Sequence, residues 1–547
     1  MRILLLQSAS KCEIKSGSSY SFHGCTGKIS WPRYGGYGLG RAGAFNAFLR
    51  MGWCPEEISE ESLPKAGSGD LLIVCEYGEL GGTTVTAIKA WMNAGGKVVA
   101  SGTSLSWTQF LHQLHLELRT ESNPYSAIAA VREGETPEIV APPRWPYFSV
   151  DNASESGPAE CFGLLAEVHG ERQSPSRALI SARRCSPYAI RNGNFWLLNA
   201  DPFAAFQAWL QGQEDLQPWL SWRHRIFWLD EFVAYIKSSL ERIGALPVGS
   251  SGSGAPGLGA TTVVLRHDLD DSRDKTYLGL ESERGVAGVH AILKDRNTAF
   301  WIDTLGSNGV HESAFHYNTA HYSRAENWLR SRLFGLPTKP YFPAKREIAG
   351  DGLLKQVRWA KRNGIGIATL HRHLSFIYYP EYVDALDTVF RLEPEVLGGS
   401  SYYRGQLLRW GIDRPDGARG TSADFPDPFF PYWFPFKLAH GGDSGRLLRG
   451  WESTSMMEVE PELFVQMLDY SIPGIPQRVI TLNYHPAHAN GTTFATGGCK
   501  TWFREVLEVI DAKRIAVMTL SDVLIEMNKW TAGSTPRTVL RGIPDVR

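Results

Sequence analysis

The sequence predicts an α/β protein built from two domains. Its 547 residues exceed the roughly 100–200 of a typical single domain, so the chain can form two sizeable cores. Short apolar runs bounded by turn residues, with a helical pattern between them, are typical of buried parallel strands and crossover helices. The segment 246–260 (LPVGSSGSGAPGLGA) contains too much glycine, serine and proline for a helix or a paired strand. We therefore expect domains at 1–245 and 261–547, joined by a flexible connector.

Composition and charge narrow the function. The chain is 43% hydrophobic and 21% charged, as folded proteins are. Because 56 Lys and Arg residues balance 57 Asp and Glu residues, no basic surplus favours nucleic acid or an anionic membrane. We expect no membrane span and no export signal, since no apolar stretch approaches the roughly 20 residues of a membrane helix. A cytoplasmic protein with seven reduced cysteines is the expectation.

The first half contains three segments with the pattern of buried strands, 2–7 (RILLLQ), 70–76 (DLLIVCE) and 97–102 (KVVASG). Between the last two, 81–96 has apolar residues at mostly helical spacing and ends in two glycines. This half resembles the class I glutamine amidotransferase-like fold, an α/β sandwich whose corresponding turn carries a nucleophilic cysteine. The turn 101–104 has no cysteine. We expect a catalytically silent parallel-sheet sandwich with a structural role or a protein partner.

Acidic residues follow the first strand of the second half. The β-branched segment 261–265 (TTVVL) runs into Arg266, His267, Asp268, Leu269, Asp270 and Asp271. An unpaired carboxylate costs several kcal/mol to bury, so this cluster must face solvent, pair with basic groups or bind a cation. Strand alternation places Asp268 and Asp270 on one face, roughly 7 Å apart. That spacing suits a metal ligand beside a general base.

Histidines follow three further predicted strands of this half. The strands are 299–305 (AFWIDTL), 364–370 (GIGIATL) and 478–484 (RVITLNY), and the histidines after them are His311, His316, His321, His371, His373 and His485. Strand ends of an α/β barrel meet at one rim. We therefore expect acids and imidazoles to gather there, as they do in zinc sites.

The second half resembles the polysaccharide deacetylase superfamily, whose NodB-homology domain is a distorted (β/α) barrel. The matching segments are Arg266–Asp270 (RHDLD), His316–His321, Leu482–Pro486 and the closing strand and helix within Lys513–Met527. The resemblance implies a divalent metal, usually zinc, with one acidic and two histidine ligands. Carried over by position, the metal ligands are Asp270, His316 and His321, the general base is Asp268, and the general acid is His485.

The motifs depart from the family pattern in two places. Leu269 separates the two carboxylates, so the base and ligand roles of Asp268 and Asp270 can be exchanged. The two histidines of the second motif are five residues apart instead of four. The histidines that could replace one of them as a ligand are His311, His371 and His373.

Candidate substrate contacts come from aromatic and basic residues. A sugar has apolar C–H faces and hydroxyl edges, so its site needs flat aromatic rings beside polar groups. The segment 425–436 offers Tyr432 and Trp433, which either bind substrate or pack in the core. Arg266 is a further candidate. The family's arginine that holds the base has no clean match, and its possible substitutes are Lys345, Arg346 and Arg266.

Together with these features, the resemblance implies a metal-dependent hydrolase that removes an N-acetyl group from a sugar or glycan precursor, of the bacterial surface-polysaccharide type. The carbohydrate is the expected partner. Two alternatives stay open at this point. One is an inactive glycan-binding or scaffold protein, and the other is a hydrolase of a different non-peptide amide.

Overall fold

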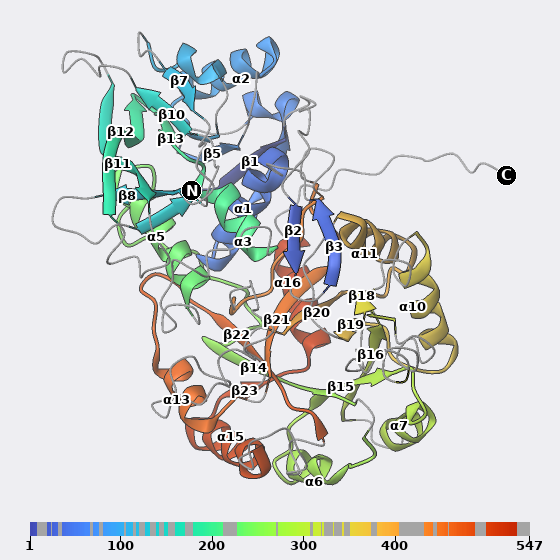
Figure 1. The fold of residues 1–547 in the computed structure, drawn as a ribbon. Coiled ribbons are helices and arrows are strands. Elements are labelled where there is room, and N and C mark those ends of the chain that lie inside the picture. Colours follow the sequence, from blue (N-terminus) through green and yellow to red (C-terminus); the bar gives the residue numbers. More distant parts are fainter. Residues whose placement is uncertain are drawn as a thin grey trace.

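The computed structural model consists of an open sheet in the first half and a closed barrel in the second (Figure 1). The residues it describes are 1–7, 19–22, 25–30, 36–65, 69–75, 80–102, 105–112, 116–119, 126–131, 138–141, 147–150, 159–169, 179–211, 227–269, 272–306, 310–318, 320–321, 332, 342–343, 350–373, 380–403, 432–440, 446–457, 459–486 and 499–532. Within these ranges, no helix has the length and apolar character needed to cross a bilayer.

The first half is built on a mixed sheet of nine strands in the described part of the chain. In spatial order they are β4 (Glu56–Ser59), β1 (Ile3–Gln7), β5 (Leu71–Cys75), β6 (Lys97–Ser101), β13 (Phe195–Leu198), β12 (Leu179–Asn192), β11 (Glu160–His169), β8 (Ser126–Val131) and β9 (Glu138–Ala141). The predicted strands β1, β5 and β6 are confirmed, and they are parallel. The expected parallel sheet is found only from β4 to β13. The remaining strands, β12, β11, β8 and β9, pair antiparallel, which corrects the expectation for this part of the sheet. A two-residue turn at Gly193 (φ +58°) joins β12 to β13 and requires an antiparallel pair.

Helices cover both faces of this sheet, since alternate residues of β1 enter different cores. Ile3 and Leu5 share one core with α1 (Gly36–Arg50), α3 (Pro202–Leu210) and α5 (Trp228–Arg242). Leu4 and Leu6 share the other core with the predicted helix, now confirmed as α2 (Gly82–Asn93). Successive strand residues face opposite sides, so the continuous apolar run of β1 needs cover on both. Smaller elements are η1 (Glu60–Lys65), η2 (Leu105–Gln109), β2 (Ser19–Phe22) with β3 (Cys25–Ser30), and β7 (Leu116–Arg119) with β10 (Tyr147–Val150).

The second half is a closed barrel of seven parallel strands among the described residues, as the sequence predicts. Around the barrel they are β14 (Thr261–Asp268), β15 (Gly288–Leu293), β16 (Glu312–Asn318), β19 (Thr369–His373), β20 (Gly398–Tyr403), β21 (Trp451–Met457) and β22 (Arg478–Asn483). Because β14 pairs with both β15 and β22, the ring closes. The predicted closing strand is β23 (Ala516–Val517), which pairs with the start of β14. One further pair is β17 (Ala320–His321) with β18 (Phe342–Pro343).

Helices lie outside this barrel (Figure 1). They are α6 (Thr276–Glu283), α7 (Thr298–Gly306), α10 (Gly352–Arg362), α11 (Pro380–Leu392), α13 (Pro461–Asp469), α15 (Cys499–Lys513) and α16 (Leu520–Ala532). The helix expected after the closing strand is confirmed as α16. Because the helices cover the outer face of the strands, both faces of the sheet are buried.

One predicted strand is wrong, since 299–305 lies in helix α7. A turn starts this helix: the side chain of Asp295 accepts from the Asn297 backbone N–H at 2.7 Å, and Thr298 Oγ1 accepts from the Asp295 N–H at 2.9 Å. Such caps satisfy backbone groups at a helix start. A short apolar run fits a helix and a strand equally well, and this turn decides between them.

The positions of three histidines relative to the strands also differ from the sequence expectation. Strand β19 begins at Thr369, so His371 and His373 lie within it rather than after it. His316, which was expected after the strand 299–305, lies within β16, a strand that the sequence pattern did not predict. These three histidines therefore lie on strands of the barrel wall.

The segment 246–260 is fixed to both halves of the molecule, which corrects the expected flexible connector. The Gly252 N–H donates to the carbonyl of Met51 at 3.2 Å. On the other side, Ala255 N–H donates to Gln477 Oε1 at 2.7 Å, and Gln477 Nε2 donates back to the Ala255 carbonyl at 2.9 Å. The glycines permit this close backbone approach instead of providing flexibility.

Replacing Gly252 with alanine is expected to destabilise the protein. A Cβ at this position would lie 1.8 Å from the carbonyl oxygen of Gly52, which is backbone and cannot turn aside. We expect a loss of about 1–3 kcal/mol in the free energy of unfolding, as for other overpacked sites. Chemical denaturation followed by circular dichroism measures it. Gly82→Ala is the control, since a Cβ there meets no atom of the described residues within 4 Å. Equal stability of the two variants would refute this role of Gly252.

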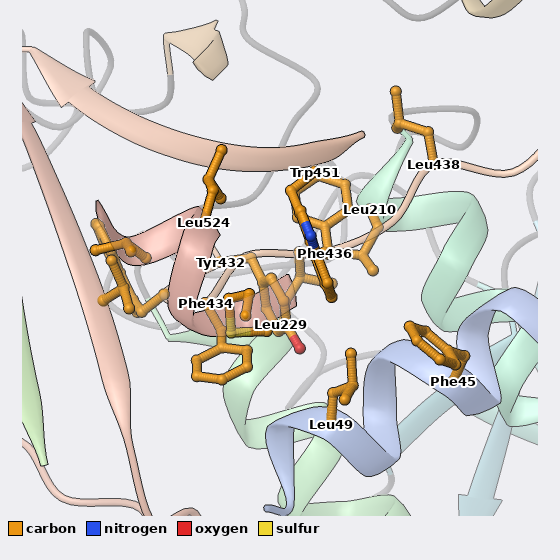
Figure 2. Close-up of a cluster of buried hydrophobic side chains, with 14 of the residues drawn as sticks. Phe45, Leu49, Leu210, Leu229, Tyr432, Phe434, Phe436, Leu438, Trp451 and Leu524 are labelled. Carbon is orange, nitrogen blue, oxygen red and sulfur yellow. The ribbon is translucent and has the colours of Figure 1, made fainter. Parts of the chain in front are cut away.

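The two halves share one hydrophobic core. Figure 2 shows Tyr432, Phe434 and Phe436 of the second half lying near Phe45 and Leu49 of α1. Beside this core, hydrogen bonds join the halves directly. The side chain of Asn46 donates to the Lys437 carbonyl at 2.9 Å and accepts from the Lys437 N–H at 2.8 Å. The segment 246–260 thus separates two sheets, not two independently packed bodies.

Candidate active site

Asp268 ends strand β14 inside the barrel, and its side chain is fully buried. Arg266 approaches one carboxylate oxygen with two nitrogens, Nε at 2.8 Å and Nη2 at 2.7 Å from Oδ1. Asn483, at the end of neighbouring strand β22, donates its amide to Oδ2 at 2.9 Å. Both carboxylate oxygens therefore have donors, which holds the carboxylate in one orientation.

Arg266 spans the barrel interior from β14 to the opposite strands. The guanidinium Nη1 donates to the Ser400 carbonyl and to Ser400 Oγ, each at 3.2 Å, and to Ser455 Oγ at 3.1 Å. Arg266 and Asp268 are two residues apart, so strand alternation directs both inward. This buried arginine supplies the counter-charge that a buried carboxylate requires.

Three histidines lie around this carboxylate. Nδ1 of His316 is 4.0 Å from Asp268 Oδ1, and Nε2 of His485 is 3.8 Å from Asp268 Oδ2. His371 is the residue on β19 that pairs with His316 on β16. We call the set Arg266, Asp268, His316, His371, Asn483 and His485 the Asp268 cluster.

The members of the Asp268 cluster differ in exposure and protonation. The side chains of Asp268 and His316 are 0% exposed, whereas that of His485 is 15% exposed. His485 is therefore the member nearest to solvent. Burial holds the pKa of His371 well below its ordinary value, and the nearby positive charge of Arg266 lowers that pKa further. His371 is thus neutral, the form of imidazole that can bind a metal.

Several predicted site residues lie outside the described residues or have no described side chain. Asp270 and Asp271 fall between the described ranges, and so do Lys345 and Arg346. The backbones of His321 and His373 are described as parts of β17 and β19, but their side chains are not. The three-ligand set Asp270, His316 and His321 therefore stays a prediction. Of the possible substitutes for the base-holding arginine, Arg266 is the one seen beside Asp268.

Tyr432 and Trp433, the predicted sugar contacts, are 1% and 2% exposed. The Trp433 carbonyl accepts a hydrogen bond from the N–H of Val479, which lies near the start of β22. Asp268 instead contacts Asn483, the last residue of that strand. A strand rise of about 3.3 Å per residue puts these points roughly 13 Å apart. The positions of both aromatic residues thus favour the core-packing alternative over substrate contact.

Sequence reasoning missed Asn483 and the two serines that hold Arg266. Asn483 lies across from Arg266 in the register between β14 and β22. Ser400 and Ser455 lie on β20 and β21, so both face the same interior as Arg266. In the sequence, Asn483 is noticeable only as a polar residue two positions before His485. Its position across from Arg266 depends on how β14 and β22 pair, which a single sequence does not show.

The residues present suit a divalent metal of the zinc class. The described groups near Asp268 that could bind a metal are imidazoles. Asp268 itself is already paired with Arg266 and accepts a hydrogen bond from Asn483. Imidazole nitrogen with carboxylate oxygen is the usual zinc environment. Asp268 is therefore better placed as a base than as a ligand, which leaves His316 as the described residue that would hold a metal and His371 as its neighbour.

No family model and no curated protein matches this chain. Similar solved structures include alpha-L-fucosidase isoenzyme 2 from Paenibacillus thiaminolyticus, with 14% identity and a TM-score of 0.26, covering 38% of this chain and 30% of that chain. A proposed polysaccharide deacetylase involved in O-antigen biosynthesis, from Bordetella bronchiseptica, has 12% identity and a TM-score of 0.24. The match covers 48% of this chain and 88% of that chain. The Xyl-CE4 domain of a multidomain xylanase, from the hindgut metagenome of Trinervitermes trinervoides, has 9% identity and a TM-score of 0.24. This match covers 49% of this chain and 91% of that chain. Polysaccharide deacetylases are thus among the neighbours, at a distance that assigns no family.

Proposed function

We propose that this protein is a metal-dependent hydrolase that removes an N-acetyl group from a sugar or glycan precursor. One observation carries the proposal. A buried carboxylate, Asp268, is oriented by Arg266 and Asn483 and has two imidazoles within 4.0 Å, at the carboxyl ends of barrel strands. Barrel enzymes place their reacting groups at these strand ends.

Asp268 serves as the general base in this proposal. Its two oxygens are held by Arg266 and Asn483, so it can accept a proton from water without reorienting. The adjacent guanidinium keeps a buried carboxylate paired before the proton arrives. A positioned base of this kind typically contributes about 10²–10⁴-fold to the rate.

His485 serves as the general acid. An amine leaves an amide poorly unless it receives a proton, and an imidazolium can give that proton near neutral pH. His485 Nε2 lies 3.8 Å from Asp268 Oδ2, on the more exposed side of the cluster. The base and the acid thus lie next to each other, and the acetamido group of a sugar would bind beside them.

His316, together with Asp270 and His321, would hold the metal, with His371 as the described alternative ligand. When bound, a divalent ion of the zinc class supplies Lewis acidity toward an amide carbonyl and toward water. The chain's own part is to present these ligands from β16, β17 and β19 and from the segment after β14. The surface-polysaccharide type of substrate rests on the RHDLD motif of residues 266–270.

Acetate release tests this function. Zinc-loaded full-length protein is incubated with N-acetylated oligosaccharides and sugar nucleotides, and acetate and free amine are both quantified. We expect the two products in equal amounts, loss of activity after chelation, and recovery with added zinc. A folded, metal-loaded protein that binds these glycans without releasing acetate would instead be a glycan-binding protein. Release of a different carboxylic acid from other amides would identify another non-peptide hydrolase.

A further inference from the structure

A second group of chemically active side chains lies on the outer face of the same strands. On β14, Asp268 faces the barrel interior and the preceding residue, His267, faces outward. The His267 ring contacts Tyr277 of α6, with ring centroids 4.3 Å apart, and Phe503 of α15, with centroids 5.1 Å apart. Both helices lie outside the barrel (Figure 1). This region is therefore separated from the Asp268 cluster by the sheet itself.

Three potential metal ligands meet there, and we call them the outer cluster: Glu281 of α6, His290 of β15, and His311 just before β16. Glu281 Oε2 is 3.6 Å from His290 Nε2 and 3.7 Å from His311 Nδ1. One ligand atom from each residue lies within 4.8 Å of the others. The side chains of Glu281 and His290 are 0% exposed, and that of His311 is 1% exposed.

Two of the three atoms that face one another in the outer cluster make no hydrogen bond within the described part of the chain. They are Glu281 Oε2 and His290 Nε2, which are both fully buried and have no hydrogen-bond partner among the described residues. Buried polar atoms nearly always find a partner, because leaving one unpaired costs free energy. Two such atoms directed at each other across 3.6 Å are too far apart for a hydrogen bond. The distance suits two ligands of one cation.

The spacing fits tetrahedral coordination. Nitrogen and oxygen ligands bind zinc at about 2.0–2.2 Å, so two ligands at a tetrahedral angle are about 3.4 Å apart. The observed separations of 3.6 and 3.7 Å are close to this value. Two imidazoles and one carboxylate form a common zinc ligand set, which leaves a fourth position for water.

Neighbouring groups orient the three ligands. His267 Nε2 lies 2.9 Å from Glu281 Oε1, which directs the other carboxylate oxygen toward the cluster. The Tyr277 hydroxyl lies 2.9 Å from His290 Nδ1, so a ring protonated at Nδ1 donates to it and presents the Nε2 lone pair. Such outer partners of metal ligands fix the tautomer and the ring orientation.

His311 is also in the form that binds a metal. Its Nδ1 accepts a hydrogen bond from the Gly288 N–H at 3.2 Å, so this nitrogen carries a lone pair. Coordination would replace that bond. Burial lowers the pKa values of both His290 and His311.

From this geometry we propose that Glu281, His290 and His311 bind a divalent metal ion of the zinc class, at a site between the barrel wall and α6. The ion would tie α6 to β15 and to the start of β16. It would be separate from any ion held by the Asp268 cluster, because the two sets of side chains leave the strands on opposite faces.

Metal content tests the site. Full-length protein is stripped with a chelator, reloaded with zinc chloride and desalted, and zinc per chain is measured by mass spectrometry. We expect Glu281→Gln and His290→Gln each to hold one zinc fewer than the wild type. Glu283→Gln is the matched control, since this residue is exposed on the same helix, and it should hold as much zinc as the wild type. A Glu281→Gln variant that keeps the full zinc content overturns the site.

A second variant separates this proposal from the proposed function. His316→Gln alters the Asp268 cluster and should keep the outer ion whether or not it loses another. Where the outer variants fail to fold, crystals of the zinc-loaded wild type give the answer. Anomalous scattering at the zinc edge should show an ion in contact with Glu281, His290 and His311. Absence of a peak there overturns the proposal, and a peak only beside His316 supports the proposed function alone.

Discussion

Replacing Asp268 with asparagine is expected to lower kcat for acetate release by about 10²–10⁴-fold, the usual contribution of a general base. Asparagine keeps the shape of the side chain and can still accept from Arg266, but it cannot take a proton from water. The charge of Arg266 then lacks its partner, so some stability is lost as well. The rate is therefore measured below the melting midpoint of the variant, on protein whose circular dichroism spectrum matches the wild type.

Asp303→Asn is the matched control, because Asp303 is exposed on α7 and belongs to no part of the Asp268 cluster. It should retain the wild-type rate. If the folded Asp268→Asn variant releases acetate as fast as the wild type, Asp268 is not the base. The exchange of roles between Asp268 and Asp270, which the motif leaves open, would then be the first alternative to test.

Replacing Arg266 with methionine is expected to lower the free energy of unfolding by about 3–5 kcal/mol, since it leaves a buried carboxylate without its counter-charge. Both side chains of this pair are almost completely buried, at 1% and 0% exposure. The guanidinium also makes three hydrogen bonds to Ser400 and Ser455, which a thioether cannot replace. Denaturation followed by circular dichroism measures the change.

The double variant Arg266→Met with Asp268→Asn isolates the charge effect. With both charges gone, it should be more stable than the sum of the two single losses predicts. Arg362→Met, on the exposed face of α10, is the control and should stay within about 0.5 kcal/mol of the wild type. An Arg266→Met variant as stable as this control would show that the pair does not hold the barrel interior together.

The sequence predicted the barrel and the meeting of Asp268, His316 and His485. It could do so because acids and imidazoles recur at the ends of several predicted strands, and those ends meet at one rim of a barrel. It did not predict α7, since the run at 299–305 fits a helix or a strand. It also did not reveal Asn483 as a partner of Asp268, because that contact depends on which residues of β14 and β22 pair.

Long-range packing accounts for the other differences. The glycines of 246–260 suggest flexibility locally, but the backbone of Gly52 lies against them from more than a hundred residues away. Tyr432 is a residue type expected in a sugar contact, yet its hydroxyl donates to the carbonyl of Asn46 at 3.3 Å in the core between the halves. Neither partner can be recognised from the local sequence.

A crystal structure of the His485→Gln variant soaked with an N-acetylglucosamine oligosaccharide would locate the reaction most directly. Loss of the acid should slow turnover enough to retain the intact substrate. We expect the acetamido carbon within about 4–5 Å of Asp268, since a base that acts through one water needs that reach. An oligosaccharide bound away from the carboxyl ends of the barrel strands, with its acetamido group far from Asp268, would contradict the account.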